Sequence, residues 1–305
     1  MPSEYSKRQN FAAPADLEIG DTAGWETCAT ADACEFCADS PFIREGALQP
    51  LSAARIFAAG FYHTYAMAKQ IVEMVIDAVT MELPDTKTIK LQWPAGYDPD
   101  FKTGQFITLY WPDTPAYKRA YSLSSCSLDR GCYEVTVKRD GKMGTRIVDW
   151  AKVGDSMVVI PPAGRFLPVF DPPNQHLICI AGGSGVTPFR AFAREATRRQ
   201  LPTKLTVLYS VRTTNDIIFR EEFRELDQAN PNFRFEVTCT RLVPEDPWTG
   251  RRGRITAEWI KEHITDLPDT VFYACGPNAL VDATEHLVLH DLGVPKAQMK
   301  TEKWG

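Results

Sequence analysis

Short stretches of alternating apolar and polar residues dominate the middle of the chain. Between residues 70 and 170 they are rich in Val, Ile and Thr and are separated by Pro, Gly and Asp. These stretches cover residues 71–79, 87–91, 105–110, 133–138 and 156–160. Because a period of two with breaks at turn residues is typical of β-strands, this part of the chain predicts an antiparallel barrel or sandwich.

A different rhythm begins after two proline clusters, at residues 161–162 and 172–173. Continuous apolar runs of strand length now alternate with stretches of helical composition. The expected strands cover residues 176–181, 204–210, 233–240 and 270–274, and the expected helices cover 189–199, 221–229, 256–263 and 279–290. This alternation predicts a parallel sheet with helices on both faces. We expect five strands in this sheet, of which the ranges above locate four. Ligands bind such sheets at the carboxyl ends of the strands.

The first 69 residues fit neither rhythm. They are rich in Asp and Glu, contain Cys28, Cys34 and Cys37, and end in a stretch, residues 51–69, whose Ala, Phe, Tyr and Met content suits a helix. We therefore expect three regions. They are an acidic, cysteine-containing extension at 1–69, a β-barrel domain at 70–170 and a parallel α/β domain at 171–305.

Composition narrows the class of protein. The chain has 305 residues, of which 44% are hydrophobic and 24% charged, as in a globular protein with room for two domains. A net charge of −5 argues against nucleic acid as the main partner, because phosphate binding needs a basic surface. No secretory signal is visible, and residues 51–68 are too short and too polar to span a bilayer. We expect a cytoplasmic protein without a membrane span.

Three short motifs stand in a fixed order in the second and third regions. They are Arg119-Ala120-Tyr121-Ser122, then a Gly-rich segment from Gly182 to Pro188, then Tyr273-Ala274-Cys275-Gly276-Pro277. Each motif is weak alone, but this order and the long gaps between the motifs are hard to obtain by chance. Together they indicate a flavin site followed by a nicotinamide dinucleotide site. Over residues 70–305 the chain resembles the ferredoxin–NADP reductase superfamily.

The resemblance implies roles for the first motif. Arg119 would contact the FAD pyrophosphate, Tyr121 would lie against the isoalloxazine ring or the ribityl chain, and the Ser122 hydroxyl would approach flavin N5. These residue types suit such roles, since a guanidinium matches a phosphate with paired donors and an aromatic face supports a flat ring.

A second phosphate-binding element is expected at Gly144-Thr145. This pair lies directly ahead of a short expected helix, residues 146–150, and free amides at the start of a helix bind anions. Val137 and Lys138 precede this turn, as in the resembled family.

The Gly-rich segment follows an apolar strand and opens a helix, which is the context of a dinucleotide phosphate loop. In the resembled family, Thr187 and Pro188 lie close to the nicotinamide and Cys275 lies near its C4 atom. An aromatic residue at the position of Trp304 covers the flavin there, although simple packing at the domain interface is an equal alternative for Trp304. The expected nucleotide contacts are Gly182, Gly183, Ser184, Gly185, Thr187, Pro188, Cys275, Gly276 and Pro277.

The choice between NADH and NADPH depends on residues that follow the second strand of the α/β region. Arg212 and Asp216 lie in a segment that resembles the NADH-using cytochrome b5 and nitrate reductases. A carboxylate at Asp216 would favour the ribose hydroxyls and repel a 2′-phosphate, so NADH is slightly favoured. NADPH is the alternative, if arginines converge on its phosphate. The candidates are Arg212, Arg241, Arg251 and Arg252.

The resemblance implies an FAD-dependent NAD(P)H reductase. In that family hydride passes from nicotinamide to flavin, here beside Ser122 and Cys275, and the electrons leave singly to a separate ferredoxin, haem or oxygenase component. The acidic residues 1–45 and the basic stretch 118–146 are either solvated faces or include a basic rim that steers an acidic acceptor. The alternatives are a flavin or small-molecule reductase without a protein acceptor, and a non-catalytic subunit that retains the fold.

The N-terminal cysteines raise a separate hypothesis of a metal site. The C-x5-C-x2-C spacing of Cys28, Cys34 and Cys37 resembles the first three ligands of adrenodoxin-type two-iron ferredoxins. That family needs a fourth Cys, and this chain has Met74 near the corresponding distance. Zinc held by the three Cys and His63 is equally permitted. The plain alternative is three reduced thiols in a partner-binding extension.

Overall fold

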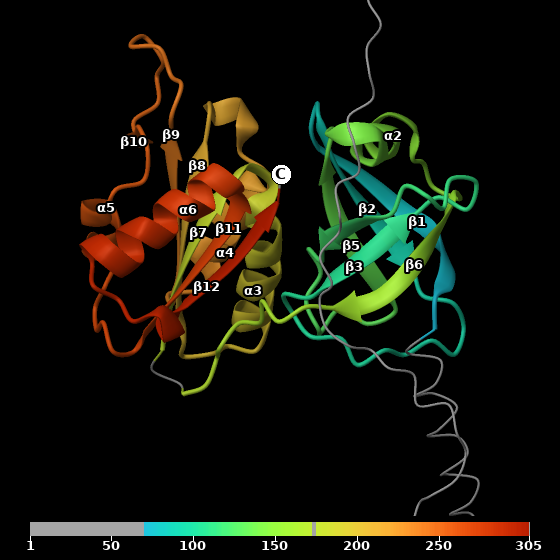
Figure 1. Ribbon diagram of the computed structural model, residues 1–305, viewed down its shortest axis with the longest axis horizontal. Helices are drawn as coiled ribbons and strands as arrows, with labels where there is room; N and C mark the ends of the chain where they lie inside the picture. Colours follow the sequence, from blue (N-terminus) through green and yellow to red (C-terminus); the bar gives the residue numbers. More distant parts are fainter. Residues whose placement is uncertain (1–69, 173–174, 305) are drawn as a thin grey trace, which may run out of the picture. The chain divides into compact units, whose positions relative to one another are not determined.

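The structure is a computed structural model that describes residues 70–172 and 175–304 (Figure 1). The hypothetical metal ligands Cys28, Cys34, Cys37 and His63, and the expected helix at 51–69, lie outside the described residues.

Within the described residues, six antiparallel strands form the first sheet. They are β1 (Val72–Leu83), β2 (Thr86–Gln92), β3 (Phe106–Tyr110), β4 (Arg119–Ser122), β5 (Cys132–Lys138) and β6 (Ser156–Ala163), in the spatial order β4-β3-β6-β1-β2-β5. A bridge between Leu123 and Val135 joins the two ends of this order. The sheet therefore closes on itself, which confirms the predicted antiparallel barrel.

The barrel interior is filled by side chains that alternate along the strands. On β1, Met74 and Ile76 are buried while Glu73 faces outward. Trp93 packs against Tyr133 inside the barrel, with ring centroids 5.1 Å apart. Because side chains fill the interior, a cofactor must bind at the outer surface of the barrel.

The end of β6 differs from the sequence prediction. We expected Pro161 and Pro162 to interrupt the chain, but β6 continues through both. The register between β3 and β6 shifts at this point. A bulge tolerates proline because the extra residue makes no ladder hydrogen bond.

Helix α2 (Gly141–Trp150) begins five residues earlier than expected, at Gly141 rather than at residue 146. Gly144 and Thr145 therefore lie inside the helix and not ahead of it. At the other end of α2, Lys87 Nζ donates to the Ala151 carbonyl oxygen at 2.9 Å. A cation is favourable at the C-terminus of a helix, so this contact fixes α2 against β2.

Six parallel strands form the second sheet of the described chain, one more than predicted. They are β7 (His176–Gly182), β8 (Lys204–Val211), β9 (Phe233–Cys239), β10 (Arg251–Arg252), β11 (Thr270–Pro277) and β12 (Met299–Trp304), in the order β10-β9-β8-β7-β11-β12. Both residues of β10 are exposed, so the hydrophobic pattern gives no sign of this edge strand. The predicted parallel α/β architecture is otherwise confirmed.

Helices cover both faces of the second sheet (Figure 1). Alternate residues of β7 belong to different cores: Cys179 shares one core with α3 (Thr187–Arg198) and α4 (Arg220–Ala229), and Ile178 shares the other with α5 (Ala257–Glu262) and α6 (Asn278–His286). Short helical turns complete the domain. They are η1 (Gly183–Val186), η2 (Thr214–Asp216), η3 (Leu287–Asp291) and η4 (Lys296–Gln298).

Candidate active site

One cavity, about 1230 Å³ in volume, is lined by residues from both sheets. On the barrel side it is bounded by β4, the end of β5 and the start of α2, and on the other side by η1 and the carboxyl ends of β8 and β11. The predicted site residues that line it are Arg119, Tyr121, Ser122, Val137, Lys138, Gly182, Gly183, Ser184, Thr187, Arg212, Asp216, Pro277 and Trp304. The predicted flavin and nucleotide residues thus share one space.

The barrel side offers a free guanidinium and a neutral phenol. Arg119 is exposed, and its Nη1 donates to the adjacent Lys118 carbonyl oxygen at 2.9 Å, which leaves its other N–H groups for a ligand. Burial raises the pKa of Tyr121 well above its usual range, so the phenol stays protonated. A paired donor and a neutral aromatic face suit a phosphate and a flat ring, respectively.

The nucleotide side is built on a tight turn at the end of β7. The Thr187 hydroxyl donates to the Ser184 carbonyl oxygen at 2.7 Å, and the Tyr209 hydroxyl donates to the Gly183 carbonyl oxygen at 2.8 Å. A Cβ on Gly185 would lie 2.0 Å from the Cys275 carbonyl oxygen, so only glycine fits there. The turn is thereby held against β11, and the start of α3 favours an anion.

The two halves of the cavity meet at one carboxylate. Glu302 Oε2 accepts a hydrogen bond from the Ser122 hydroxyl at 3.2 Å and from the Cys275 thiol at 3.8 Å. Burial raises the pKa of Glu302, although these two hydrogen bonds lower it in part. Burial also raises the pKa of Cys275, which keeps the sulfur as a thiol. The site thus holds a serine, a thiol and a carboxyl group that is easier to protonate than usual.

Glu302 is a site residue to which the sequence analysis assigned no role. Its place depends on the pairing of β12 with β11, in which Glu302 lies opposite Cys275. That register is a tertiary feature without a local sequence signal. Trp304, two residues further along β12, lies over Gly185 and packs against the core beneath α3.

Positive charge dominates the cavity walls. Seven basic side chains line it against three acidic ones, so it favours a ligand with several negative charges. The basic residues are Arg119, Lys138, Arg139, Arg212, Arg241, Arg254 and Lys303, and the acidic ones are Asp140, Asp216 and Glu302.

Three of these arginines have no side-chain partner among the described residues. They are Arg212, Arg241 and Arg254, which all line the cavity. Arg251 and Arg252, the other candidates from the sequence, are engaged elsewhere. Arg251 pairs with Glu262, and Arg252 donates to the Val243 and Asp246 carbonyl oxygens at 3.0 and 2.7 Å. Arg254 was not among the candidates from the sequence, because the turn after β10 places it in the cavity wall.

Asp216 lies in the cavity wall, but its carboxylate is already used. Its Oδ2 atom accepts from both the backbone N–H and the hydroxyl of Thr213, each at 2.8 Å. These contacts close a capping box around η2. The carboxylate is thus fixed in place by its own turn.

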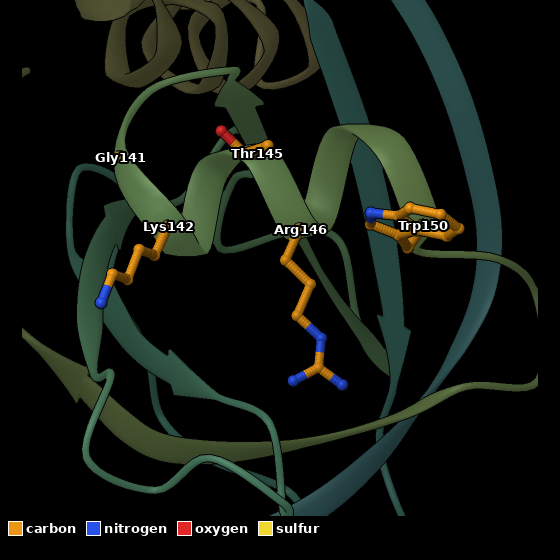
Figure 2. A pocket seen from close by; sticks show the side chains of 5 residues that line it. All are labelled: Gly141, Lys142, Thr145, Arg146 and Trp150. Atoms are coloured by element: carbon orange, nitrogen blue, oxygen red, sulfur yellow. The ribbon is translucent and has the colours of Figure 1, made fainter. Parts of the chain in front are cut away.

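Helix α2 borders a second, shallower depression of about 850 Å³. Figure 2 shows Lys142 and Arg146 on the same side of α2, with Trp150 near its end. Thr145 lines this depression and not the main cavity. Gly144 is buried, and a Cβ there would lie 2.4 Å from the Lys138 carbonyl oxygen, so this glycine lets α2 pack against the end of β5.

The remaining predicted residues support the cavity from behind. Gly185, Pro188, Cys275 and Gly276 are buried and do not line it. A Cβ on Gly276 would lie 3.1 Å from the backbone N and O atoms of Gly182, so Gly276 allows β11 to approach the end of β7, where η1 begins.

Within residues 70–172 and 175–304, no group of three or more His, Cys, Asp or Glu side chains is arranged to hold a metal ion. None of the helices there combines the length and the apolar character needed to cross a membrane.

Two known domain families match the chain. The Oxidoreductase FAD-binding domain family matches residues 73–167, and the Oxidoreductase NAD-binding domain family matches residues 179–286. The structure is similar to the Flavohem-like FAD/NAD binding domain of nitric oxide dioxygenase from Vibrio cholerae. The TM-score is 0.66 and the identity 26%, over 76% of this chain and 98% of that chain.

Three curated relatives extend the comparison. A flavohemoprotein of Rhodopirellula baltica is 30% identical over 97% of this chain and 73% of that protein. A glycine betaine monooxygenase reductase subunit of Chromohalobacter salexigens is 31% identical over 67% of this chain and 56% of that protein. A ferredoxin–NADP reductase B of Sorangium cellulosum is 28% identical over 67% of this chain and 85% of that protein.

The fold, the cavity and these matches define a two-domain flavoprotein with a pyridine nucleotide site. The chain belongs to the ferredoxin–NADP reductase superfamily. Within that superfamily it is an NAD(P)H-dependent flavoprotein oxidoreductase.

Proposed function

We propose that this chain takes electrons from NAD(P)H into FAD and passes them singly to a separate redox protein. The observation that carries the proposal is the shared cavity, in which Ser122 from the barrel contacts Glu302 from the parallel sheet, with the Cys275 thiol behind Glu302. Bound FAD would supply the chemistry that no side chain can, because a flavin accepts a hydride and releases single electrons.

The described residues fit the phosphates of FAD. Arg119 presents unused N–H groups at the barrel wall, and α2 begins beside it. The first four N–H groups of a helix, counted from its N-cap, have no partner within the helix, and here they are those of residues 140–143. The proposed pyrophosphate contacts are therefore Arg119 and these amides, while Gly144 contributes by letting α2 pack against the end of β5.

The residues around Glu302 have complementary tasks. Ser122 and Cys275 orient the Glu302 carboxyl by donating to Oε2, and burial raises the pKa of this carboxyl, so it is protonated more readily than an exposed glutamate. The ring of Trp304 lies over Gly185 and lines the cavity. The arrangement orients the reacting partners and restricts water.

The unpaired arginines favour NADPH over NADH. A 2′-phosphate would carry up to two negative charges to a wall where Arg212, Arg241 and Arg254 have no side-chain partner in the part of the chain that the structure describes. Asp216 opposes this with one charge, and its carboxylate is already hydrogen-bonded to Thr213. We infer that the three guanidiniums outweigh the carboxylate, which reverses the slight preference for NADH expected from the sequence.

A protein acceptor is supported by the relatives. Two of them are named as a monooxygenase reductase subunit and a ferredoxin–NADP reductase. We propose a ferredoxin, a haem protein or an oxygenase component as the acceptor. The iron–sulfur or zinc site at Cys28, Cys34 and Cys37 is a further proposal, which iron, sulfide and zinc analysis of anaerobically purified protein tests.

The decisive experiment compares acceptors for the purified chain. We expect yellow protein with one FAD, rapid bleaching by NADPH without oxygen, and reduction of a one-electron protein acceptor such as cytochrome c. Faster reduction of added free FMN than of cytochrome c would favour the flavin reductase alternative. Protein without flavin after reconstitution with FAD would contradict the proposal and favour a non-catalytic subunit.

A further inference from the structure

Helix α3 carries three arginines on one face. Arg190, Arg194 and Arg198 are spaced four residues apart, so their side chains line one side of the helix. All three reach carboxylates or carbonyl groups outside α3. Arg190 is the most enclosed, with its side chain 8% exposed.

Two of these arginines converge on one carboxylate of the barrel. Glu134 Oε2 on β5 accepts from Arg190 Nη1 and from Arg194 Nη1, each at 2.9 Å. The same arginines bind Glu222 on α4, with Arg190 Nε at 2.7 Å from Oε2. The Arg190 guanidinium also stacks over the Phe219 ring at 4.4 Å. Two positive charges are thus held between a carboxylate of the barrel and a carboxylate of the nucleotide domain.

A second set of contacts between α3 and the barrel continues this line of ion pairs, which we call the seam. Arg198 pairs with Asp129 of the barrel and donates to the Leu128 carbonyl oxygen at 3.3 Å. Glu195 of α3 accepts from the Thr103 hydroxyl and, at 3.2 Å, from the Ser127 hydroxyl. Glu195 also pairs with Arg199 at 2.8 Å, so four arginines in α3 and at its C-cap face four carboxylates along the seam.

Both ends of this connection lead to the cavity. Arg190 lies three residues after Thr187 on α3, about 4.5 Å along the helix axis. Glu134 lies three residues before Val137 on β5, and Val137 lines the cavity on the barrel side. A shift at the Glu134 contact would therefore move η1 and the start of α3 relative to β4 and β5.

We propose that Glu134, through Arg190 and Arg194, is a positioning residue that sets the orientation of the nucleotide domain against the flavin barrel. The proposal rests on the proposed function. Removing the carboxylate leaves Arg190 without a barrel partner and Arg194 with only Asp129, at 4.0 Å, and the repulsion between the two guanidiniums loosens the seam. The nucleotide and the flavin then bind normally but meet less often in the reactive geometry.

The test compares Glu134→Gln with Glu262→Gln in the full chain. Glu262 on α5 pairs with Arg251 on the face of the sheet opposite α3, so its loss breaks an ion pair without touching the seam. Flavin content, the dissociation constant of NADPH, the rate of flavin reduction and amide hydrogen exchange of residues 187–190 are measured for each. The wild-type protein and Glu134→Asp, which keeps a shorter carboxylate, complete the series.

In Glu134→Gln we expect full flavin content, an NADPH dissociation constant within about threefold of wild type and flavin reduction slowed about ten- to a hundredfold. Exchange of the amides at 187–190 should rise in the same variant without any ligand, and Glu134→Asp should recover part of both effects. Glu262→Gln should match wild type.

Wild-type exchange and reduction in Glu134→Gln would overturn the positioning role. Loss of flavin from Glu134→Gln would also overturn it, because the defect would then lie in β5 itself. A wild-type protein that neither binds flavin nor is reduced by NADPH would instead refute the proposed function, and the exchange measurement would still test the seam.

Discussion

The Ser122 hydroxyl donates to Glu302 Oε2 at 3.2 Å, although 180 residues separate the two along the chain. Ser122 ends a strand of the barrel, and Glu302 lies on an edge strand of the parallel sheet. This hydrogen bond links the residue expected beside the flavin to Glu302, the only carboxyl group among the described residues for which a raised pKa is found.

Replacing Glu302 should slow reduction of the flavin by NADPH. Glu302→Ala removes the acceptor for Ser122 and the carboxyl proton, and we expect a loss of about 10²-fold or more, as for other positioned proton donors. Flavin content should stay unchanged because Glu302 faces Ser122 and Cys275 rather than the basic wall. Rapid-mixing absorbance measures the rate.

The pH dependence of flavin reduction distinguishes a proton-donating role of Glu302 from a role in packing and hydrogen bonding alone. Because burial raises the pKa of this carboxyl, the protonated form persists above pH 4.5 and the rate should fall as pH rises through the raised pKa. Glu302→Gln keeps a hydrogen-bonding group of the same size and should lose this fall. A variant with an unchanged profile would remove Glu302 from proton chemistry.

Arg119 should govern the affinity for FAD. Losing a charge-assisted phosphate contact costs about 1.5 to 3 kcal/mol, so Arg119→Ala should weaken FAD binding about ten- to a hundredfold. Dialysis followed by the flavin-to-protein absorbance ratio measures the loss. Arg234→Ala is the matched control, because this exposed arginine pairs only with Asp227 and the Phe233 carbonyl oxygen, away from the cavity. Equal flavin retention in both variants would argue against the phosphate role.

Arg254 should discriminate between the two nucleotides. Arg254→Ala should raise the dissociation constant of NADPH about tenfold and leave that of NADH nearly unchanged, since only NADPH carries the 2′-phosphate. Arg252→Ala serves as the control, because Arg252 binds carbonyl oxygens outside the cavity. Titration of each variant with both nucleotides, followed by flavin fluorescence, gives the constants. An equal effect on NADH and NADPH would refute the assignment.

Gly185 should tolerate no side chain. A Cβ there would meet the Cys275 carbonyl oxygen at 2.0 Å and the Trp304 ring at 2.7 Å, so Gly185→Ala must displace β11 or the turn. We expect a loss of stability of about 1 to 3 kcal/mol and weaker nucleotide binding. Gly183→Ala isolates the backbone effect, because its Cβ meets nothing within 4 Å although its φ is +55°. Urea unfolding should rank Gly185→Ala as clearly the less stable of the two.

His176 should make the protein sensitive to acid. It is buried, its Nε2 lies 2.8 Å from the Thr206 hydroxyl, and its Nδ1 has no partner among the described residues. Burial lowers its pKa to about 4 from 6.5. The unfolded chain therefore binds the proton more readily between these values, so stability is full above pH 6.5 and falls as pH drops toward 4, by about 3 kcal/mol.

Urea unfolding at pH 8 and pH 5 measures this loss. His176→Gln keeps a hydrogen-bonding group for Thr206 and should lose less stability on acidification than wild type does. The control is His286→Gln, since His286 is exposed. A similar acid sensitivity in wild type and His176→Gln would assign the effect to other groups.

The sequence was sufficient where local pattern determines structure. The alternation around Met74 and Ile76 and the apolar run of β7 predicted the barrel and the parallel sheet, because burial follows directly from side-chain period. Features set by tertiary pairing were not predictable. The start of α2 at Gly141, the two-residue strand β10 and the place of Glu302 opposite Cys275 all depend on neighbours distant in sequence.

The register of β12 against β11 determines which side chain lies opposite Cys275 in the active site. Successive residues of a strand point to opposite faces, so a slip of one residue would bring Thr301 or Lys303 to the place opposite Cys275. The same slip would turn Met299, which is buried in the core with α5 and α6, to the opposite face of the sheet. A single-residue insertion in the turn before Met299 would therefore cost stability and the active-site carboxyl together, since a hydroxyl or a cation would take its place.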